Sequence, residues 1–197
     1  MTISKKIVVG ISGASGSIYG LRLLEKLRIR GGVETHLIVT RSGERTAFLE
    51  TGKRAADIRA LADYHYPVED IGASLASGSK PPDALVIAPC SIHTMSALAC
   101  GISSNLLIRA ADVALKERRT VVLMVRETPF HLGHLRTMAA LTEMGAIIAP
   151  PIPGFYHHPQ SILDIVDHSV ERVMDLIGCP APDARRWDPG SEPAPSK

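Results

Sequence analysis

Aromatic side chains are scarce in this chain of 197 residues, making up 4% of it with a single tryptophan. That scarcity argues against a protein that stacks nucleic-acid bases. A formal net charge of +2 gives no reason to expect nucleic acid or an anionic membrane surface as a partner. Long apolar runs are also missing, since no stretch approaches the ~18 apolar residues that a membrane span requires. We therefore expect neither a nucleic-acid-binding protein nor a membrane protein.

Cysteine is scarce as well. The three cysteines, Cys90, Cys100 and Cys179, form no CxxC pair and no even disulfide framework. The first apolar run ends at Gly10 and is too short for a signal peptide. These features predict reduced thiols and a cytoplasmic protein.

Apolar, β-branched runs alternate with longer amphipathic segments, which is typical of βαβ units around a parallel sheet. The expected strands are 7–12, 34–40, 83–88, 120–126 and 146–149. The expected helices are 17–30, 42–50, 92–100, 104–118, 133–144 and 159–177. Pro159 suits the first turn of the last helix. Residues 51–82 are less periodic, and the segment "ASLASGSKPP" within them reads as a surface excursion before the next strand.

One domain, residues 1–178, is predicted to hold all of these elements, followed by a proline-rich tail over residues 179–197. Five prolines in that tail prevent a helix or a central strand. Trp187 lies in the tail, where it either docks on a neighbouring subunit or stays exposed to solvent.

A glycine-rich turn follows the first expected strand. Gly10, Gly13 and Gly16 give a G-x-x-G-x-x-G spacing, which is not the G-x-G-x-x-G of dinucleotide folds. No Gly-Lys-Ser/Thr follows, which excludes a Walker A loop, and the esterase G-x-S-x-G pattern fails at Ser17. Two interpretations remain: a turn that lets a flat or phosphorylated ligand approach, with hydroxyls at Ser12, Ser15 and Ser17, or a tight turn without a ligand.

A second turn, "APCSIHT", begins where the strand at 83–88 ends. Ser91 stands at a helix N-cap position with Thr94 one turn later, so two hydroxyls and free N–H groups form an anion site. The alternative is an ordinary capped helix, in which His93 lies on the helix surface.

Charged side chains mark two further places. Arg109 and Lys116 are seven residues apart and share a helical face, so they either clamp a phosphate or form a solvated face. Arg126 and Glu127 end an apolar strand, where they suit ligand binding and proton transfer; a surface ion pair is the alternative.

The stretch "APPIPGFYHHPQS" is a stiff loop that presents Phe155 and Tyr156 before the last helix. Its adjacent histidines, like the pair His131 and His134, come without a set of three or four ligands, so we predict no metal site.

Five motifs occur in order: "GISGASG", "APCSIHT", "LIRAADVALKERR", "VRETPFHLGHL" and "PPIPGFYHHPQS". Together they resemble the UbiX-type flavin prenyltransferases, the family that includes small subunits of phenolic-acid decarboxylase systems. The resemblance runs from about residue 5 to Trp187. It implies an α/β fold, a three-layer Rossmann-like or flavodoxin-like parallel sheet with helices on both faces.

Family members are expected to assemble as a dodecamer with active sites between subunits. They attach a dimethylallyl group from dimethylallyl monophosphate to N5 and C6 of reduced FMN without a metal. The prenylated FMN then serves a partner decarboxylase of the UbiD type. Neither the recipient decarboxylase nor the choice between monophosphate and diphosphate donors follows from the sequence.

The resemblance also assigns roles to individual residues. The flavin would lie against Gly13, Ala14, Ser15, Thr40 and Arg126, with its phosphate on Ser91, Ile92, His93 and Thr94. The prenyl phosphate would be held by Arg109, Lys116, Tyr156 and Arg172, partly from neighbouring subunits. The residues expected to take part in the chemistry are Ser15, Glu50, Glu127 and Tyr156, with Glu127 in proton transfer.

Two rival functions stay open. An FMN-dependent decarboxylase of peptidyl or pantothenoyl cysteine has the same fold, but a catalytic histidine after its first helix and a PASANT-like turn are expected there. The third possibility is a flavin carrier without catalysis.

Overall fold

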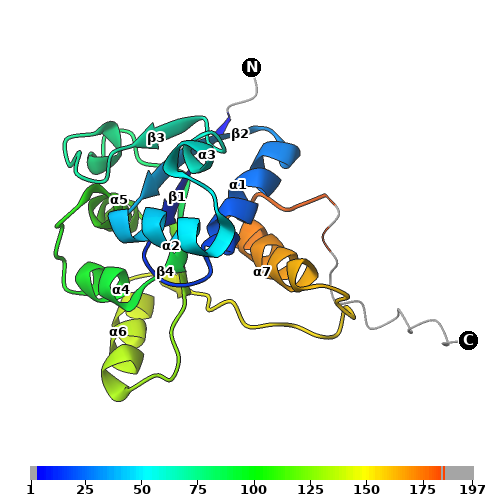
Figure 1. The fold of residues 1–197 in the computed structure, drawn as a ribbon. Coiled ribbons are helices and arrows are strands. Elements are labelled where there is room, and N and C mark those ends of the chain that lie inside the picture. The colour runs from blue at the N-terminus through cyan, green and yellow to red at the C-terminus, as the bar shows by residue number, and fades with distance from the viewer. Residues whose placement is uncertain (1–3, 183, 185–197) are drawn as a thin grey trace, which may run out of the picture.

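In the computed structural model, which describes residues 4–182 and 184, parallel strands form one six-stranded sheet (Figure 1). The strands are β1 (Lys5–Ile11), β2 (Val33–Val39), β3 (Tyr64–Tyr66), β4 (Ala84–Cys90), β5 (Thr120–Val125) and β6 (Ala146–Ile148). Their order across the sheet is β3-β2-β1-β4-β5-β6. All pairings are parallel, as the βαβ alternation predicted.

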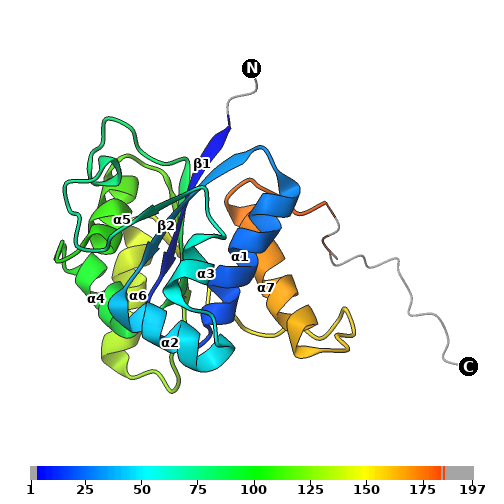
Figure 2. The same cartoon turned by 45° about the horizontal axis from the view of Figure 1, so that its top comes forward.

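Helices cover both faces of the sheet, which confirms the predicted three-layer α/β class (Figure 2). The helices are α1 (Ser17–Arg30), α2 (Arg41–Thr51), α3 (Ala55–Arg59), α4 (Ile92–Ala99), α5 (Leu106–Lys116), α6 (Leu132–Glu143) and α7 (Ile162–Leu176), with a 3-10 turn η1 at Ser74–Ala76. On one face α1 and α7 lie side by side, and α4, α5 and α6 lie on the other (Figures 1 and 2).

The core sits on both faces of the central strands. Along β1, Ile7, Val9 and Ile11 pack under the α1–α7 layer, while Val8 packs under the α4–α6 layer. Successive side chains of a strand point to opposite faces. A strand buried on both faces therefore needs an unbroken apolar run, and β1, β4 and β5 have one.

The direction in which the chain adds strands to the sheet reverses between β1 and β4. From β1 the chain builds outward through β2 and β3, and from β4 it builds to the other side through β5 and β6. The loops that leave β1 and β4 therefore diverge at their carboxyl ends, and ligands of open α/β sheets bind in the crevice formed there.

Two sequence predictions need correction. The less periodic stretch 51–82, where no helix or strand was expected, contains α3, the edge strand β3 and η1, of which only η1 lies within "ASLASGSKPP". With three residues, two of them exposed, β3 carries no apolar periodicity that could reveal it. The last helix begins at Ile162 and not at Pro159, because Ser161 and Asp164 form a capping box at its start.

An ion-pair network joins α1 to α7. The guanidinium of Arg22 donates two hydrogen bonds to the Asp167 carboxylate, Nε to Oδ1 at 2.9 Å and Nη2 to Oδ2 at 2.8 Å. Lys26 Nζ lies 3.2 Å from Asp167 Oδ2 and 2.8 Å from Glu171 Oε1. The network is half-buried, so it contributes more than an exposed pair would.

The predicted boundary at residue 178 stays untested, and Trp187 lies outside the described residues. Within residues 4–182 and 184, none of the helices combines the length and apolarity that crossing a membrane takes.

Candidate active site

The glycine turn after β1 and the serine turn after β4 are held together by one buried hydroxyl. Ser12 Oγ donates to the carbonyl of Pro89 at 2.8 Å and accepts from the N–H of Ser91 at 2.7 Å. The Ser12 N–H also donates to the Pro89 carbonyl at 3.2 Å. Ser12 was predicted as a hydroxyl for a ligand, but the protein's own backbone engages it, so its role is to align the two turns.

Neighbouring atoms of the same chain explain two of the glycines. A Cβ on Gly13 would come within 2.4 Å of Ser42 Oγ, at the start of α2. Gly16 has a φ of 99°, a left-handed conformation that side chains disfavour. The glycine spacing thus arises from packing and turn geometry, which the interpretation as a ligand-free turn also predicted, and it is not by itself evidence for a ligand.

Glu50, on the last turn of α2, caps the start of α1. Its carboxylate accepts hydrogen bonds from the Gly16 N–H, the Ser17 N–H at 2.9 Å and the Ser17 hydroxyl at 2.7 Å. Burial alone would raise the pKa of Glu50, but hydrogen bonds from Ser15 and Ser17 outweigh it and lower that pKa. The ionised carboxylate replaces the side-chain cap that Gly16 cannot provide, and a part for Glu50 in the chemistry stays a prediction.

The serine turn has the predicted helix cap. Ser91 Oγ accepts from the Thr94 N–H at 3.3 Å and donates to Thr94 Oγ1 at 3.1 Å. The N–H groups of Ile92 and His93 belong to the first turn of α4, where no earlier carbonyl can accept them. Together with the two hydroxyls and the helix dipole, they suit a phosphate dianion.

Thr40 lies beside the glycine turn, because its N–H donates to the Ile11 carbonyl at 3.0 Å. Its hydroxyl caps α2 by accepting from the Gly43 N–H at 3.0 Å. Ser15 and Ala14 lie in the same turn, and Ser15 is exposed while Ala14 is buried. The structure thus brings the residues predicted around the flavin to one edge of the sheet.

Arg126 and Glu127 leave the carboxyl end of β5 at that edge. The Arg126 N–H donates to the Cys90 carbonyl at 3.1 Å, and the Arg126 side chain is exposed. Glu127 is half-buried, and its Oε1 accepts from the Thr128 N–H at 3.0 Å. The site therefore has an accessible cation next to a carboxylate.

Tyr19 was missed by the sequence reasoning. Burial raises its pKa and the charge of Arg126 opposes that shift, which places the two side chains near each other. A Cβ on Gly16 would lie 3.1 Å from the Tyr19 ring, so the ring also covers the glycine turn. The sequence feature that could have pointed to Tyr19 is its position as an aromatic residue in the first turn of the helix after the glycines.

The four residues predicted to hold the prenyl phosphate do not come together in one chain. Arg109 and Lys116 lie on α5, where they pair with Asp112 at 2.7 Å and with Glu117. Tyr156 and Arg172 lie in the loop before α7 and on α7 itself. Since α5 and α7 cover opposite faces of the sheet, Arg109 and Lys116 lie on one face and Arg172 lies on the other (Figure 1).

Tyr156 has a partner that the sequence did not suggest. Its Oη lies 2.6 Å from Nε2 of His168, one turn before Arg172 on α7. The His157 ring stacks on the His168 ring with centroids 4.3 Å apart.

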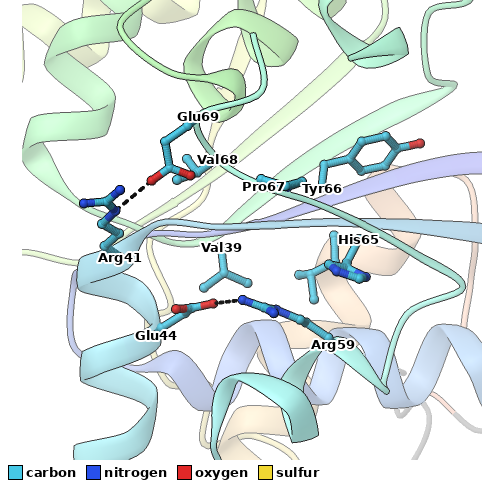
Figure 3. A pocket seen from close by; sticks show the side chains of 10 residues that line it. Val39, Arg41, Glu44, Arg59, His65, Tyr66, Pro67, Val68 and Glu69 are labelled. Atoms are coloured by element: carbon cyan, nitrogen blue, oxygen red, sulfur yellow. Dashed lines mark hydrogen bonds and ion pairs between the residues drawn. The ribbon is translucent and has the colours of Figure 1, made fainter. Parts of the chain in front are cut away.

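A hollow of about 310 Å³ lies where β2 and β3 meet α2 and α3 (Figure 3). Two ion pairs flank it, Arg41 Nε with Glu69 Oε1 at 2.7 Å and Arg59 Nη2 with Glu44 Oε1 at 2.9 Å. Both arginines are neutralised by carboxylates, and the lining contains none of the predicted site residues. We therefore place the site at the turns after β1, β4 and β5 and not in this hollow.

The histidines and the buried cysteine near this edge have structural surroundings. The described part of the chain contains no group of three or more His, Cys, Asp or Glu side chains that could hold a metal. His131 Nδ1 accepts from the Gly133 N–H at 3.0 Å, which makes it the cap of α6. Burial raises the pKa of Cys90 to about 12, so this thiol is no nucleophile at neutral pH.

Comparison with known proteins shows the family of the chain. The Flavoprotein family matches residues 1–174. A flavin prenyltransferase UbiX of Thauera aromatica is 52% identical over 187 residues, which is 95% of this chain and 96% of that protein. The UbiX of Escherichia coli K12 is 50% identical and covers 93% of this chain and 98% of its own length.

Solved structures show the same likeness. AnUbiX, in complex with FMN and dimethylallyl pyrophosphate, superposes with a TM-score of 0.92 at 42% identity, over 95% of this chain and 99% of that one. A dodecameric FMN-dependent UbiX-like decarboxylase from Escherichia coli O157:H7 gives 0.91 at 44% identity, over 93% and 99%. The cysteine decarboxylase TvaF, at 19% identity and a TM-score of 0.58, shares only the fold.

Proposed function

Because this chain belongs to the UbiX family of flavin prenyltransferases, we propose that it joins a dimethylallyl group to N5 and C6 of reduced FMN. The donor is dimethylallyl monophosphate and the product is prenylated FMN. The observation that carries the proposal is one edge of the sheet that combines an anion-binding helix start, an accessible arginine and a carboxylate, in a chain half identical to UbiX enzymes.

The residues at this edge fit FMN. Ser91, Thr94 and the first N–H groups of α4 would hold its phosphate, with the glycine turn and Thr40 along its ribityl chain and ring. Arg126 would contact the flavin from β5. When bound, reduced FMN supplies the electron-rich N5 and C6 atoms.

The prenyl phosphate needs a second subunit. Arg109 and Lys116 would approach the Tyr156 and Arg172 of a neighbouring chain, because the two pairs lie on opposite faces of their own sheet. Large apolar side chains lie exposed near the same edge, including Phe130, Leu132 and Phe155. Association would cover them, and a dodecamer is proposed by analogy with the dodecameric relative.

In the proposed reaction, the side chains stabilise the charge of the leaving phosphate and transfer protons. Breaking the allylic C–O bond leaves a phosphate dianion, which arginine and lysine stabilise as the charge develops. N5 and C6 must each lose a proton. The prenyl double bond gains one proton as its far carbon bonds to C6, and the other proton goes to the departing phosphate. Glu127, half-buried at the end of β5, would take part in these transfers, and the exposed Ser15 would lie beside the reacting edge.

Two further parts of the proposal rest on the family. Prenylated FMN would pass to a decarboxylase of the UbiD type, and the protein would act in the cytoplasm. The two rival functions, cysteine decarboxylation and flavin carriage, predict different products.

In the deciding experiment, the purified protein is incubated with reduced FMN and either dimethylallyl monophosphate or the diphosphate. The mass of the flavin is then measured by mass spectrometry. A gain of one prenyl unit is expected, with the monophosphate as the better donor. Unchanged flavin with both donors would point to a carrier, and release of carbon dioxide from a cysteine-ended peptide would point to the decarboxylase.

A further inference from the structure

Three rings and one glycine pack together where the loop after β6 meets α7. Tyr156 Oη and His168 Nε2 are 2.6 Å apart, and their rings meet edge to face with centroids 5.3 Å apart. His157 stacks on the other side of His168, with an angle of 15° between the rings. A Cβ on Gly154 would lie 3.0 Å from His168 Cε1 and 3.3 Å from Tyr156 Cε1. The His168 ring is therefore held on three sides.

His168 is in its neutral form at physiological pH. Burial lowers its pKa, the neighbouring His157 lowers it further, and Glu171 opposes both. A neutral imidazole has one N–H donor and one acceptor nitrogen. The hydrogen bond to Tyr156 can thus run in either direction, depending on which nitrogen carries the proton.

Only one direction suits a tyrosine that binds phosphate. If the Tyr156 hydroxyl donated to His168, its oxygen would present lone pairs to an anion. If His168 Nε2–H donates instead, the tyrosine hydroxyl does not use its hydrogen on His168 and can direct it at a phosphate oxygen. A hydrogen bond to a charged group contributes more than a neutral one, so the direction affects affinity.

We propose that His168 is a positioning residue that donates Nε2–H to Tyr156 and so directs the tyrosine hydroxyl hydrogen to the prenyl phosphate. The inference rests on the proposed function, in which Tyr156 and Arg172 bind that phosphate. Arg172 follows His168 by four residues and shares its helical face, so one turn of α7 orients the tyrosine and carries the arginine.

The test is a double-mutant cycle in phosphate-donor binding. Dimethylallyl monophosphate is titrated into the full-length protein with oxidised FMN, so that no turnover occurs. His168→Phe keeps a stacked ring without the donor and is expected to weaken the Kd about tenfold, as Tyr156→Phe does. Both changes break the same chain of hydrogen bonds, from His168 through Tyr156 to the phosphate. The double variant should therefore bind within about twofold of either single variant.

Two further variants separate positioning from folding. His168→Gln offers an amide N–H near the place of Nε2 and should restore binding to within about threefold of the original protein. His65→Phe, on the exposed edge strand β3, should leave the Kd unchanged. Unfolding temperature and oligomer size are compared for every variant.

Some results would overturn the inference. Effects of His168→Phe and Tyr156→Phe that multiply in the double variant would show independent roles, and an unchanged Kd in His168→Phe would show no role in binding. Absence of prenylated flavin from the original protein would reject the proposed function, whereas the binding cycle would still decide whether His168 acts through Tyr156.

Discussion

At the scale of single residues, hydrogen bonds within the protein occupy several groups that looked available to a ligand. Ser12 and Ser17 both have polar side chains that resemble ligand donors in the sequence. In the structure Ser12 bonds the backbone of the serine turn, and Ser15 and Ser17 both bond Glu50, although Ser15 is exposed. Partners 33 to 79 residues away along the chain decide this, and local sequence does not contain them.

Glu127 gives the prediction at this scale. Glu127→Gln keeps the size of the side chain and removes its basicity, so FMN should bind normally while prenylated FMN forms more slowly. A loss of about 10²–10⁴-fold in the rate is expected for a positioned base. Single-turnover mass analysis of the flavin measures the rate, and flavin titration measures the binding.

Glu143→Gln, on the exposed C-terminal turn of α6, is the matched control and should form product at the original rate. Normal product formation by Glu127→Gln would remove this carboxylate from the mechanism and leave the departing phosphate as the base.

At the scale of elements, strongly periodic segments could be predicted and weak ones could not. The strands around β1, β4 and β5 follow from apolar runs that both faces of the sheet bury. The N-cap at Ser91 follows from local chemistry, because a serine before an apolar helix accepts its first N–H groups. The edge strand β3 was not predicted, because it is a strand only through its pairing with β2.

The pairing of α1 with α7 gives the prediction at this scale. Burial would raise the pKa of Asp167, but hydrogen bonds from Arg22 and Lys26 overcome it and hold that pKa below its usual value. A carboxyl with a depressed folded-state pKa stabilises the fold above its unfolded pKa of about 4, and the contribution disappears as the pH falls through the folded value.

Asp167→Asn should therefore cost about 1–2 kcal/mol at pH 7, between an exposed and a buried pair. The deficit should shrink as the pH falls below about 4. Unfolding in urea at several pH values measures it, with the exposed Asp70→Asn as control. A deficit that stays constant down to pH 3 would mean that Asp167 acts through packing and not through its charge.

At the scale of the whole molecule, the sheet separates residues that the proposed reaction needs together. The family resemblance suggested a shared site, and the two-faced placement of α5 and α7 supplies the physical reason. The sequence alone could not show this separation, because it does not reveal on which face of the sheet a residue will lie. The residues concerned are Arg109, Lys116, Tyr156 and Arg172.

Mixing two inactive variants tests the shared site. Arg109→Ala and Arg172→Ala, which affect the two groups that lie on opposite faces of the sheet, should each be nearly inactive alone. When the two are expressed together, about a quarter of the sites in randomly mixed oligomers receive both native residues from different chains. Activity of mixed oligomers should therefore recover to roughly that fraction of the original.

Two variants affecting residues of one chain's own site, Glu127→Gln and Arg126→Ala, should not complement each other when expressed together. No recovery in the first mixture would place Arg109 and Arg172 in the same chain's site.

The Ser12 hydroxyl has a consequence for how ligands come and go. It bonds the two turns that would hold the ring and the phosphate of the flavin, so these turns cannot separate without breaking three hydrogen bonds. The two turns are therefore fixed to each other, and the flavin has to enter and leave past other segments. Exchange of the flavin and release of the product would have to involve other parts of the rim, of which residues 128–131 are exposed.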